Sequence, residues 1–139
     1  MLTVQLGQCG NQLGSALFRR FAENEERVRD DDEVEGYFFR RKRRRGRTGK
    51  ASIPVARALM VDTEPKVLSK CVQEASEHGG WAYGDDARIC EQTGSGNNWA
   101  FGSRVHGPAL RRRVSNGLRK MVEEMDRCPS FLILQSVAG

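Results

Sequence analysis

A glycine-rich segment near the start of this 139-residue chain has the composition of a phosphate-binding turn. Residues 7–14 read GQCGNQLG, and glycines of this kind let backbone amides approach a phosphate where a helix begins. The segment has neither the Gly-x-Gly-x-x-Gly spacing of a dinucleotide site nor the lysine of a P-loop. A tight structural turn therefore explains these residues equally well.

Two acidic residues, Asp62 and Glu64, follow an apolar run and precede Pro65. Carboxylates at the junction of a strand and a helix can hold Mg²⁺ beside phosphates, usually through water. The alternative is helix capping by Asp62 or Thr63, with Glu64 favoured there by the helix dipole. From the local sequence alone, capping is the simpler interpretation.

A second glycine-rich segment, residues 94–100 (GSGNNWA), combines flexible glycines with side-chain amides. Successive backbone amides in such a loop can form an anion-binding nest around a phosphate tail. An ordinary Gly-Asn turn anchored by Trp99 would have a similar sequence. The chain ends at residues 136–139 (SVAG), directly after an apolar segment. The last carbonyls of a buried strand need cover, so we expect this chain to be part of a longer domain.

Hydrophobic periodicity predicts the elements that carry these loops. Short β-strands are expected at residues 3–6, 55–61, 88–90 and 131–136. Helices are expected between them, one after Gly7, one from Pro65 and one from Pro108. Their predicted buried faces are, in order, Leu13, Ala16, Leu17 and Phe21; Val67, Leu68, Cys71, Val72 and Ala75; and Leu110, Val114, Leu118, Met121, Val122 and Met125.

This alternation of strands and helices predicts an α/β fold with a doubly wound parallel sheet. In that architecture ligands bind at the carboxyl ends of the strands. The loops after residues 6, 61, 90 and 136 are therefore expected to form one candidate site.

The net charge of +5 arises in one stretch of the chain. Eight of the 23 basic residues lie between Arg40 and Lys50, and the rest of the chain carries 15 basic against 18 acidic residues. Eight acidic residues lie between Glu23 and Glu35, so residues 27–50 are expected to form a charged surface loop. Such a basic run could bind nucleic acid or acidic proteins, or act as a nuclear import signal. A solvated insertion that contacts only the neighbouring acidic run, or nothing at all, is the simpler alternative.

The four cysteines and two histidines give no metal-binding pattern. No two cysteines form a Cys-x-x-Cys pair, so structural zinc is not expected, and reduced thiols in a cytosolic protein are the simpler interpretation. No secretory signal is evident, and the apolar runs are far too short to cross a bilayer, so no membrane association is expected.

Residues 7–14, 62–65 and 94–100 resemble three motifs of the tubulin family, in the family's order and at roughly its distances. The resemblance covers the whole chain except the charged loop. Four segments are similar to the delta subfamily of tubulins, namely residues 56–58 (ARA), 62–67 (DTEPKV), 105–108 (VHGP) and 136–139 (SVAG).

The resemblance implies a Rossmann-like GTPase-type domain, of which residues 1–139 are the incomplete N-terminal part, with GTP or GDP as cofactor. By position in the motifs, Gln8 and Cys9 would contact the phosphates and nucleotide, with Gln12 nearby. Glu64 would reach Mg²⁺ beside the phosphates through water. The other residues carried over are those around the γ-phosphate, Gly94, Ser95, Gly96, Asn97 and Asn98, and those that open the main phosphate loop, Ser136, Ala138 and Gly139.

In this family most contacts to the diphosphate, the base-binding segments and the acidic residue used in hydrolysis lie beyond the point that matches residue 139. The resemblance therefore implies part of a nucleotide site and no catalytic residue within the chain, and GTPase activity rests on the resemblance alone. It implies a cytoskeletal protein of the cytoplasm whose partners are other tubulins, microtubules or proteins of centrioles, basal bodies and cilia. The alternative is a protein that uses Arg40–Lys50 to bind RNA or acidic protein tails without nucleotide.

Overall fold

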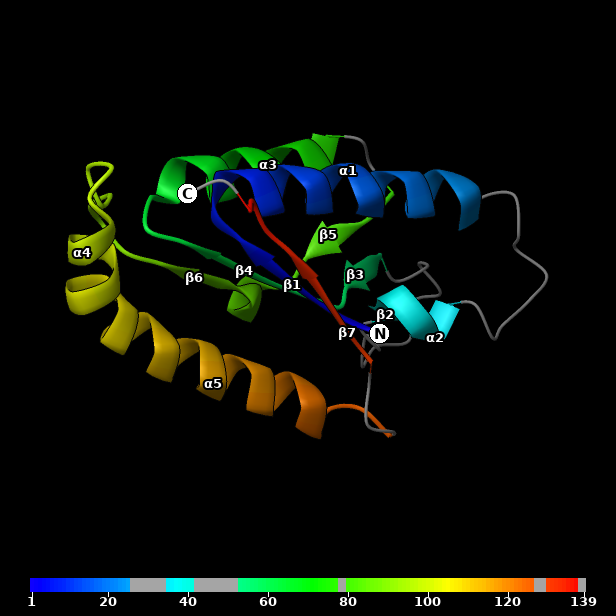
Figure 1. The fold of residues 1–139 in the computed structure, drawn as a ribbon. Coiled ribbons are helices and arrows are strands. Elements are labelled where there is room, and N and C mark those ends of the chain that lie inside the picture. Colours follow the sequence, from blue (N-terminus) through cyan, green and yellow to red (C-terminus); the bar gives the residue numbers. More distant parts are fainter. Residues whose placement is uncertain (26–34, 42–52, 78–79, 127–129, 138–139) are drawn as a thin grey trace.

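The computed structural model describes residues 1–25, 35–41, 53–77, 80–126 and 130–137. It has a central parallel sheet with helices α1 (Gly7–Glu25) and α3 (Pro65–Glu77) on one face and α5 (Gly107–Glu123) on the other (Figure 1). The predicted α/β fold with a doubly wound parallel sheet is therefore confirmed. No helix within these ranges is long and apolar enough to span a membrane.

The central sheet, within the described residues, contains four strands in the order β6-β4-β1-β7. They are β1 (Leu2–Leu6), β4 (Ala58–Asp62), β6 (Arg88–Cys90) and β7 (Phe131–Leu134), and every neighbouring pair is parallel. The chain runs from β1 outward to β4 and β6, then returns through α5 to β7 on the other side of β1. This order places a topological switch point between β1 and β7, the place where such sheets bind ligands.

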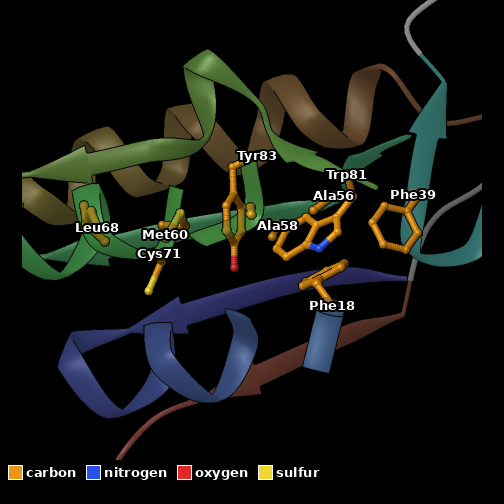
Figure 2. Packing of buried hydrophobic residues seen from close by; sticks show 10 residues of the cluster. Phe18, Phe39, Ala56, Ala58, Met60, Leu68, Cys71, Trp81 and Tyr83 are labelled. Carbon is orange, nitrogen blue, oxygen red and sulfur yellow. The ribbon is translucent and has the colours of Figure 1, made fainter. Parts of the chain in front are cut away.

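Because successive side chains of β4 point to opposite faces of the sheet, the described residues pack into two cores, one on each face. Ala58 and Met60 pack with residues of α1 and α3, whereas Leu59 and Val61 pack with residues of α5. The first core is rich in aromatic rings, which group beside the sheet (Figure 2). Its members are Phe18, Phe39, Ala56, Ala58, Met60, Leu68, Cys71, Ala75, Trp81 and Tyr83.

The predicted buried face of α3 is confirmed, and that of α5 is confirmed except at Met125, which follows the end of the helix and is half-buried. In α3 the side chains of Leu68, Cys71 and Ala75 are buried. In α5 Met121 is buried, and four partly buried neighbours pack against the second core, namely Leu110, Val114, Leu118 and Val122. Both helices therefore bind the sheet through ordinary apolar stripes.

The predicted buried face of α1 is wrong at Leu13 and Ala16, which are exposed, whereas Leu17 is half-buried and Phe21 packs against the first core as predicted. Leu13 is 52 % exposed, and the buried positions are Gly10, Asn11, Gly14, Ser15 and Phe18. A Cβ at Gly10 would collide with the carbonyl oxygen of Leu134, and one at Gly14 with the side-chain amide of Gln5. The helix lies too close to the strands for a stripe of leucines, so small residues form the contact.

A second sheet with strand order β2-β3-β5 is a feature that the sequence pattern does not predict. It consists of β2 (Phe39–Arg41), β3 (Pro54–Ala56) and β5 (Ala82–Tyr83), with β2 antiparallel and β5 parallel to β3. The single strand predicted at residues 55–61 is two strands that separate at Arg57. The Arg57 N–H donates to the Phe38 carbonyl at 2.8 Å, and the Thr3 N–H donates to the Arg57 carbonyl at 2.9 Å.

Residues 35–41 belong to the stretch predicted as a charged loop, and they form α2 (Glu35–Phe38) and β2. Phe39 is fully buried in the first core. Residues 27–34 and 42–50, which make up the rest of the predicted loop, lie outside the described residues. Three short elements complete the described chain, namely η1 (Asp85–Ala87), α4 (Trp99–Phe101) and η2 (Gly102–His106), a π-helical turn that leads into α5.

Candidate functional site

The loops that follow β1, β4, β6 and β7 lie at one edge of the central sheet, here called the carboxyl edge, because these strands are all parallel. Figure 1 shows the starts of α1 and α3, the segment before α4 and the end of β7 on this side of the molecule. The predicted convergence of the four loops is thus seen in the structure.

The first loop is short because α1 begins at Gly7, directly after β1. Gly7 has a φ of +67°, in the left-handed region that glycine adopts without strain. The predicted nucleotide residues Gln8, Cys9 and Gln12 are exposed in the first turns of the helix. Free N–H groups and the positive end of the helix dipole favour an anion at this position.

The end of β7 lies against the first turns of α1. No side chain fits between them, since a Cβ at Gly10 would collide with the carbonyl oxygen of Leu134. Ser136 follows two residues later and is exposed. Ala138 and Gly139, the other residues predicted in this loop, lie outside the described residues. The structure thus brings the start of the fourth loop to the first.

Asn11 joins the first loop to the second. Its Nδ2 donates to the carbonyl of Gly7 at 2.8 Å and to the carbonyl of Val61, near the end of β4, at 3.1 Å. The backbone carbonyl of Asn11 accepts a hydrogen bond from Cys71 Sγ in α3 at 3.6 Å. Burial, reinforced by the charge of Glu74, raises the pKa of the Cys71 thiol, so the sulfur keeps the proton that it donates. One residue therefore connects α1, β4 and α3.

The two carboxylates of the second loop have different environments, since Glu64 is exposed and Asp62 is half-buried. The Glu64 N–H donates to Asp62 Oδ1 at 3.2 Å, which forms an Asx-turn before α3. The other oxygen, Asp62 Oδ2, is buried without a hydrogen-bond partner among the described residues. Local turn formation therefore uses only half of the Asp62 carboxylate.

This carboxylate pair fits a cation that is held mainly by phosphate and water oxygens. Mg²⁺ prefers oxygen ligands and usually keeps several waters. The described part of the chain contains no group of three or more His, Cys, Asp or Glu side chains that could hold a metal ion by themselves. The buried Asp62 Oδ2 and the exposed Glu64 carboxylate thus suit a shared phosphate–cation site and not an all-protein one.

The third loop packs against the second through Gly94, where a Cβ would collide with the Glu64 carboxylate. Residues 95–98 then form a tight turn. Gly96 and Asn97 have φ values of +57° and +55°, and the Asn98 N–H donates to the Ser95 carbonyl at 3.0 Å. Two left-handed residues closed by this hydrogen bond define a type I′ turn.

Asn98, and not Trp99, anchors the far end of the third loop. Asn98 Oδ1 accepts a hydrogen bond from the Phe101 N–H at 3.1 Å and so caps α4. Trp99 is 80 % exposed, so the sequence-based idea that this ring anchors the turn is wrong. The Ser95 side chain lies against Gly102, which holds the turn against η2.

Two residues at the carboxyl edge, Asn11 and Asp62, have structural features that the sequence does not reveal. Asn11 lies within the glycine-rich segment, but its bond to Val61 joins residues 50 positions apart and leaves no local signal. Asp62 is visible as a carboxylate in the sequence, yet only the structure shows that one of its oxygens is buried and unpaired among the described residues.

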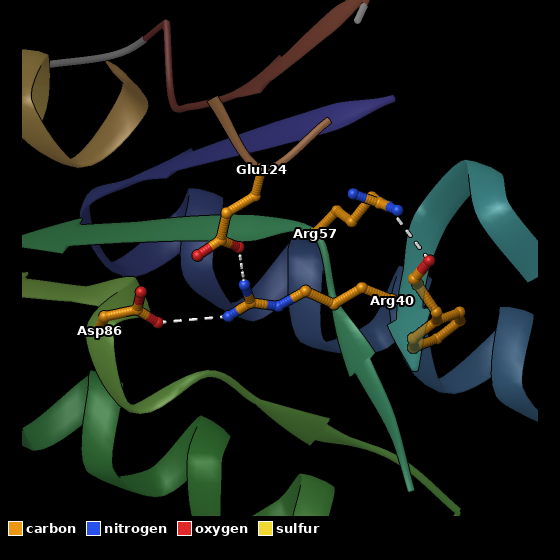
Figure 3. Close-up of polar contacts among 5 residues, drawn as sticks. Arg40, Arg57, Asp86 and Glu124 are labelled. Atoms are coloured by element: carbon orange, nitrogen blue, oxygen red, sulfur yellow. Dashed lines mark hydrogen bonds and ion pairs between the residues drawn. The ribbon is translucent and has the colours of Figure 1, made fainter. Parts of the chain in front are cut away.

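The one basic-run residue whose side chain is described, Arg40, lies in an ion-pair cluster apart from these loops (Figure 3). Its guanidinium contacts Glu124, just after α5, and Asp86 at 3.3 Å. Arg57 lies beside it and donates from Nε to the Phe39 carbonyl at 3.1 Å. Burial, reinforced by the charge of Arg40, lowers the pKa of Arg57. Arg40 therefore has a structural role that the reading of the run as a solvated loop did not anticipate.

Comparison with known families finds one match over the whole chain. A sequence model described as "Tubulin/FtsZ family, GTPase domain" matches residues 1–139. Among individual proteins, the tubulin delta chain of Homo sapiens is 40 % identical over 142 aligned residues, and that of Mus musculus is 41 % identical over 143. The tubulin epsilon chain of Mus musculus is 33 % identical over 150.

These alignments cover 99–100 % of the present chain but only 30–31 % of each relative. The chain thus spans about three tenths of the length of the curated relatives that it matches.

Proposed function

The chain belongs to the Tubulin/FtsZ family through its GTPase domain, and from this premise we propose that it supplies the first part of a guanine-nucleotide site in a delta-like tubulin. The observation that supports this most strongly is the assembly of the carboxyl edge. Three separate contacts tie its loops together, namely Asn11 to Val61, Glu64 to Gly94, and Gly10 to Leu134. One of these contacts, Gly10 to Leu134, lies at the switch point between β1 and β7, where parallel α/β sheets bind ligands.

We propose that GTP or GDP lies with its phosphates at this edge. Gln8 and Cys9 are exposed at the N-terminus of α1, where backbone N–H groups favour an anion, and Gln12 lies one turn further. The third loop offers backbone amides around a left-handed turn, which suits the terminal phosphate. Its residues are Gly94, Ser95, Gly96, Asn97 and Asn98, and Ser136, Ala138 and Gly139 would open the next phosphate loop.

The proposed Mg²⁺ would be held by phosphate oxygens and water, with Glu64 and Asp62 as outer acceptors. When bound, the cation offsets the negative charge of the phosphates. Glu64 is positioned for this by its contact with Gly94, and Asp62 has a buried oxygen without a partner among the described residues. Hydrolysis itself is not assigned to any residue of this chain.

The experiment that tests the proposal measures GTP retention and its dependence on Mg²⁺ in the natural protein that carries this chain. Gln8→Ala and Glu64→Ala should both weaken retention, because each removes a polar group from the carboxyl edge. Gln73→Ala and Glu77→Ala are matched controls, since these exposed residues of α3 bond to each other at 2.7 Å instead of lying at that edge. Unchanged retention in both site variants would reject the assignment.

The same experiment separates nucleotide binding from binding of polyanions through Arg40–Lys50. Polyanion binding should fall steeply with ionic strength and need no guanine. Nucleotide binding should require Mg²⁺ and discriminate GTP from ATP. Arg40 is already paired with Asp86 and Glu124, so its charge is less available for a polyanion.

We also propose a cytoskeletal role with other tubulins or microtubule proteins as partners. The matched relatives are named as tubulin delta and epsilon chains, and the delta subfamily resemblance points to centrioles, basal bodies or cilia. Imaging of the tagged natural protein against a centriolar marker tests this. A diffuse cytoplasmic or a nuclear distribution would count against the centriolar assignment.

A further inference from the structure

Asn11 lies at the point where β1 and β4 separate. The two strands pair in parallel as far as Leu6 and Val61. Beyond this pair the chain of β1 turns into α1 at Gly7, whereas β4 continues to Asp62 and pairs with β6. The backbone pairing of β1 with β4 therefore ends just before the two segments that carry Gln8 and Glu64, and it no longer fixes their relative position.

The side-chain amide of Asn11 spans this separation. Its single nitrogen donates to the carbonyl of Gly7 on one side and to the carbonyl of Val61 on the other, at 2.8 and 3.1 Å. The Asn11 side chain is fully buried, and its bond to Val61 is buried, whereas its bond to Gly7 is partly buried. Since both partners are acceptors, only the NH₂ end of the amide can face them, and the orientation of the side chain is fixed by the network.

Few other side chains could make both bonds. Leucine has a similar shape but no donor, and would leave the carbonyls of Gly7 and Val61 without this partner. Aspartate would place a carboxylate against the same two oxygens. Serine keeps a donor but is too short to reach the carbonyls of both Gly7 and Val61. The side-chain oxygen Oδ1 of Asn11 is buried without a hydrogen-bond partner among the described residues, which lowers the stability of the fold.

We propose that Asn11 is a positioning residue that sets the distance between the phosphate-binding turn of α1 and the acidic loop after β4. The inference rests on the proposed nucleotide function. Gly7 is adjacent to Gln8, and Val61 is adjacent to Asp62, so the two bonds hold the groups proposed for the phosphates and for the cation in one arrangement. Asn11 is fully buried, so it acts through Gly7 and Val61 and does not itself contact the proposed nucleotide.

The test compares Asn11→Leu and Asn11→Asp with a matched control, Gln5→Met, in the natural protein that carries this chain. Gln5 is also a fully buried amide, but it bonds to Tyr83 and not to either loop. GTP affinity, thermal stability and hydrogen exchange of residues 7–9 and 62–64 are measured for each. Asn11→Ser serves as the milder variant if the others fail to fold.

We expect the Asn11 variants to weaken GTP binding about tenfold or more, the amount that one lost buried hydrogen bond can produce. Both loops should exchange faster even without nucleotide, while Gln5→Met loses stability without either effect. GTP affinity and loop exchange equal to wild type in the Asn11 variants would overturn the inference. If the wild-type protein binds no GTP, the proposed function fails, and the exchange of the two loops alone decides whether Asn11 positions them.

Discussion

The carboxylate of Glu64 lies directly against the backbone of Gly94, so closely that a Cβ on residue 94 would collide with Glu64 Oε1. The contact joins the loop after β4 to the loop after β6, two segments that are 30 residues apart in sequence. Glycine at position 94 is thus what allows the acidic side chain to lie across the third loop.

Gly94→Ala should therefore displace the Glu64 carboxylate without unfolding the chain. The atom in the way is the far end of a flexible, exposed side chain, which can swing aside at little cost. We expect Mg²⁺-dependent GTP retention to fall while the melting temperature stays nearly unchanged. Gly80→Ala is the control, because its Cβ would meet only Ala22 at 3.9 Å. GTP retention equal to wild type in Gly94→Ala would show that nucleotide binding does not depend on the position of the Glu64 carboxylate.

Gly10→Ala should behave differently, since the obstructing atom belongs to the backbone of β7. The new Cβ would collide with the carbonyl oxygen of Leu134, so the helix or the strand must move. We expect a loss of about 1–3 kcal/mol in the free energy of unfolding, as for other overpacked sites. Denaturant titration measures it, with Gln12→Ala as an exposed control on the same helix. Equal stability of the two variants would contradict the close packing of α1 on β7.

Arg40→Ala should weaken the link between β2, η1 and the end of α5. Arg40 is 27 % exposed and its partners Asp86 and Glu124 about half exposed, so solvent screens both pairs. We expect a loss of about 0.5–1.5 kcal/mol, and a smaller loss at high salt. A double-mutant cycle with Glu124→Ala isolates the pair, and Arg112→Ala on the exposed face of α5 is the control. A coupling energy of zero at low salt would show that the Arg40–Glu124 pair contributes no stability.

Tyr83 and Cys71 should make the fold sensitive to alkaline pH. Burial raises the pKa of Tyr83 above its ordinary value of 10.0 and that of Cys71 above 9.0. Between the ordinary pKa of each group and its raised pKa in the fold, the folded state keeps a proton that the unfolded chain releases. The stability that both groups contribute is therefore complete below about pH 9 and is lost as the pH rises further.

Tyr83→Phe removes both the hydrogen bond from Tyr83 to Gln5 and the titration of the Tyr83 hydroxyl, and the two losses are seen at different pH. The variant should lose about 1–3 kcal/mol at neutral pH, because the amide oxygen of Gln5 loses its donor, which lies at 3.3 Å. It should also lose less further stability than wild type as the pH is raised, because one of the two titrating groups is gone. Denaturant titrations across the alkaline range measure both. An unchanged pH profile in Tyr83→Phe would show that Tyr83 does not titrate with unfolding.

The sequence alone determined the order of the main elements and the edge at which their loops meet. Apolar periodicity placed the strands of the central sheet and the buried stripes of α3 and α5, because such patterns are local and repeat within one element. It also identified the loops of the candidate site, since glycine, amide and carboxylate side chains stand directly after predicted strands.

Tertiary structure decided what joins those elements. The buried face of α1 depends on how closely Gly10 and Gly14 approach β7 and β1, and the split between β3 and β4 depends on bonds from Arg57 to other segments. The same holds for Asn11 at Val61 and for Arg40 at Glu124, pairs that lie 50 and 84 residues apart. A local pattern specifies which side of a helix or strand is apolar, but not which distant backbone atom it meets. That depends on strand order and packing distance, which only the folded chain fixes.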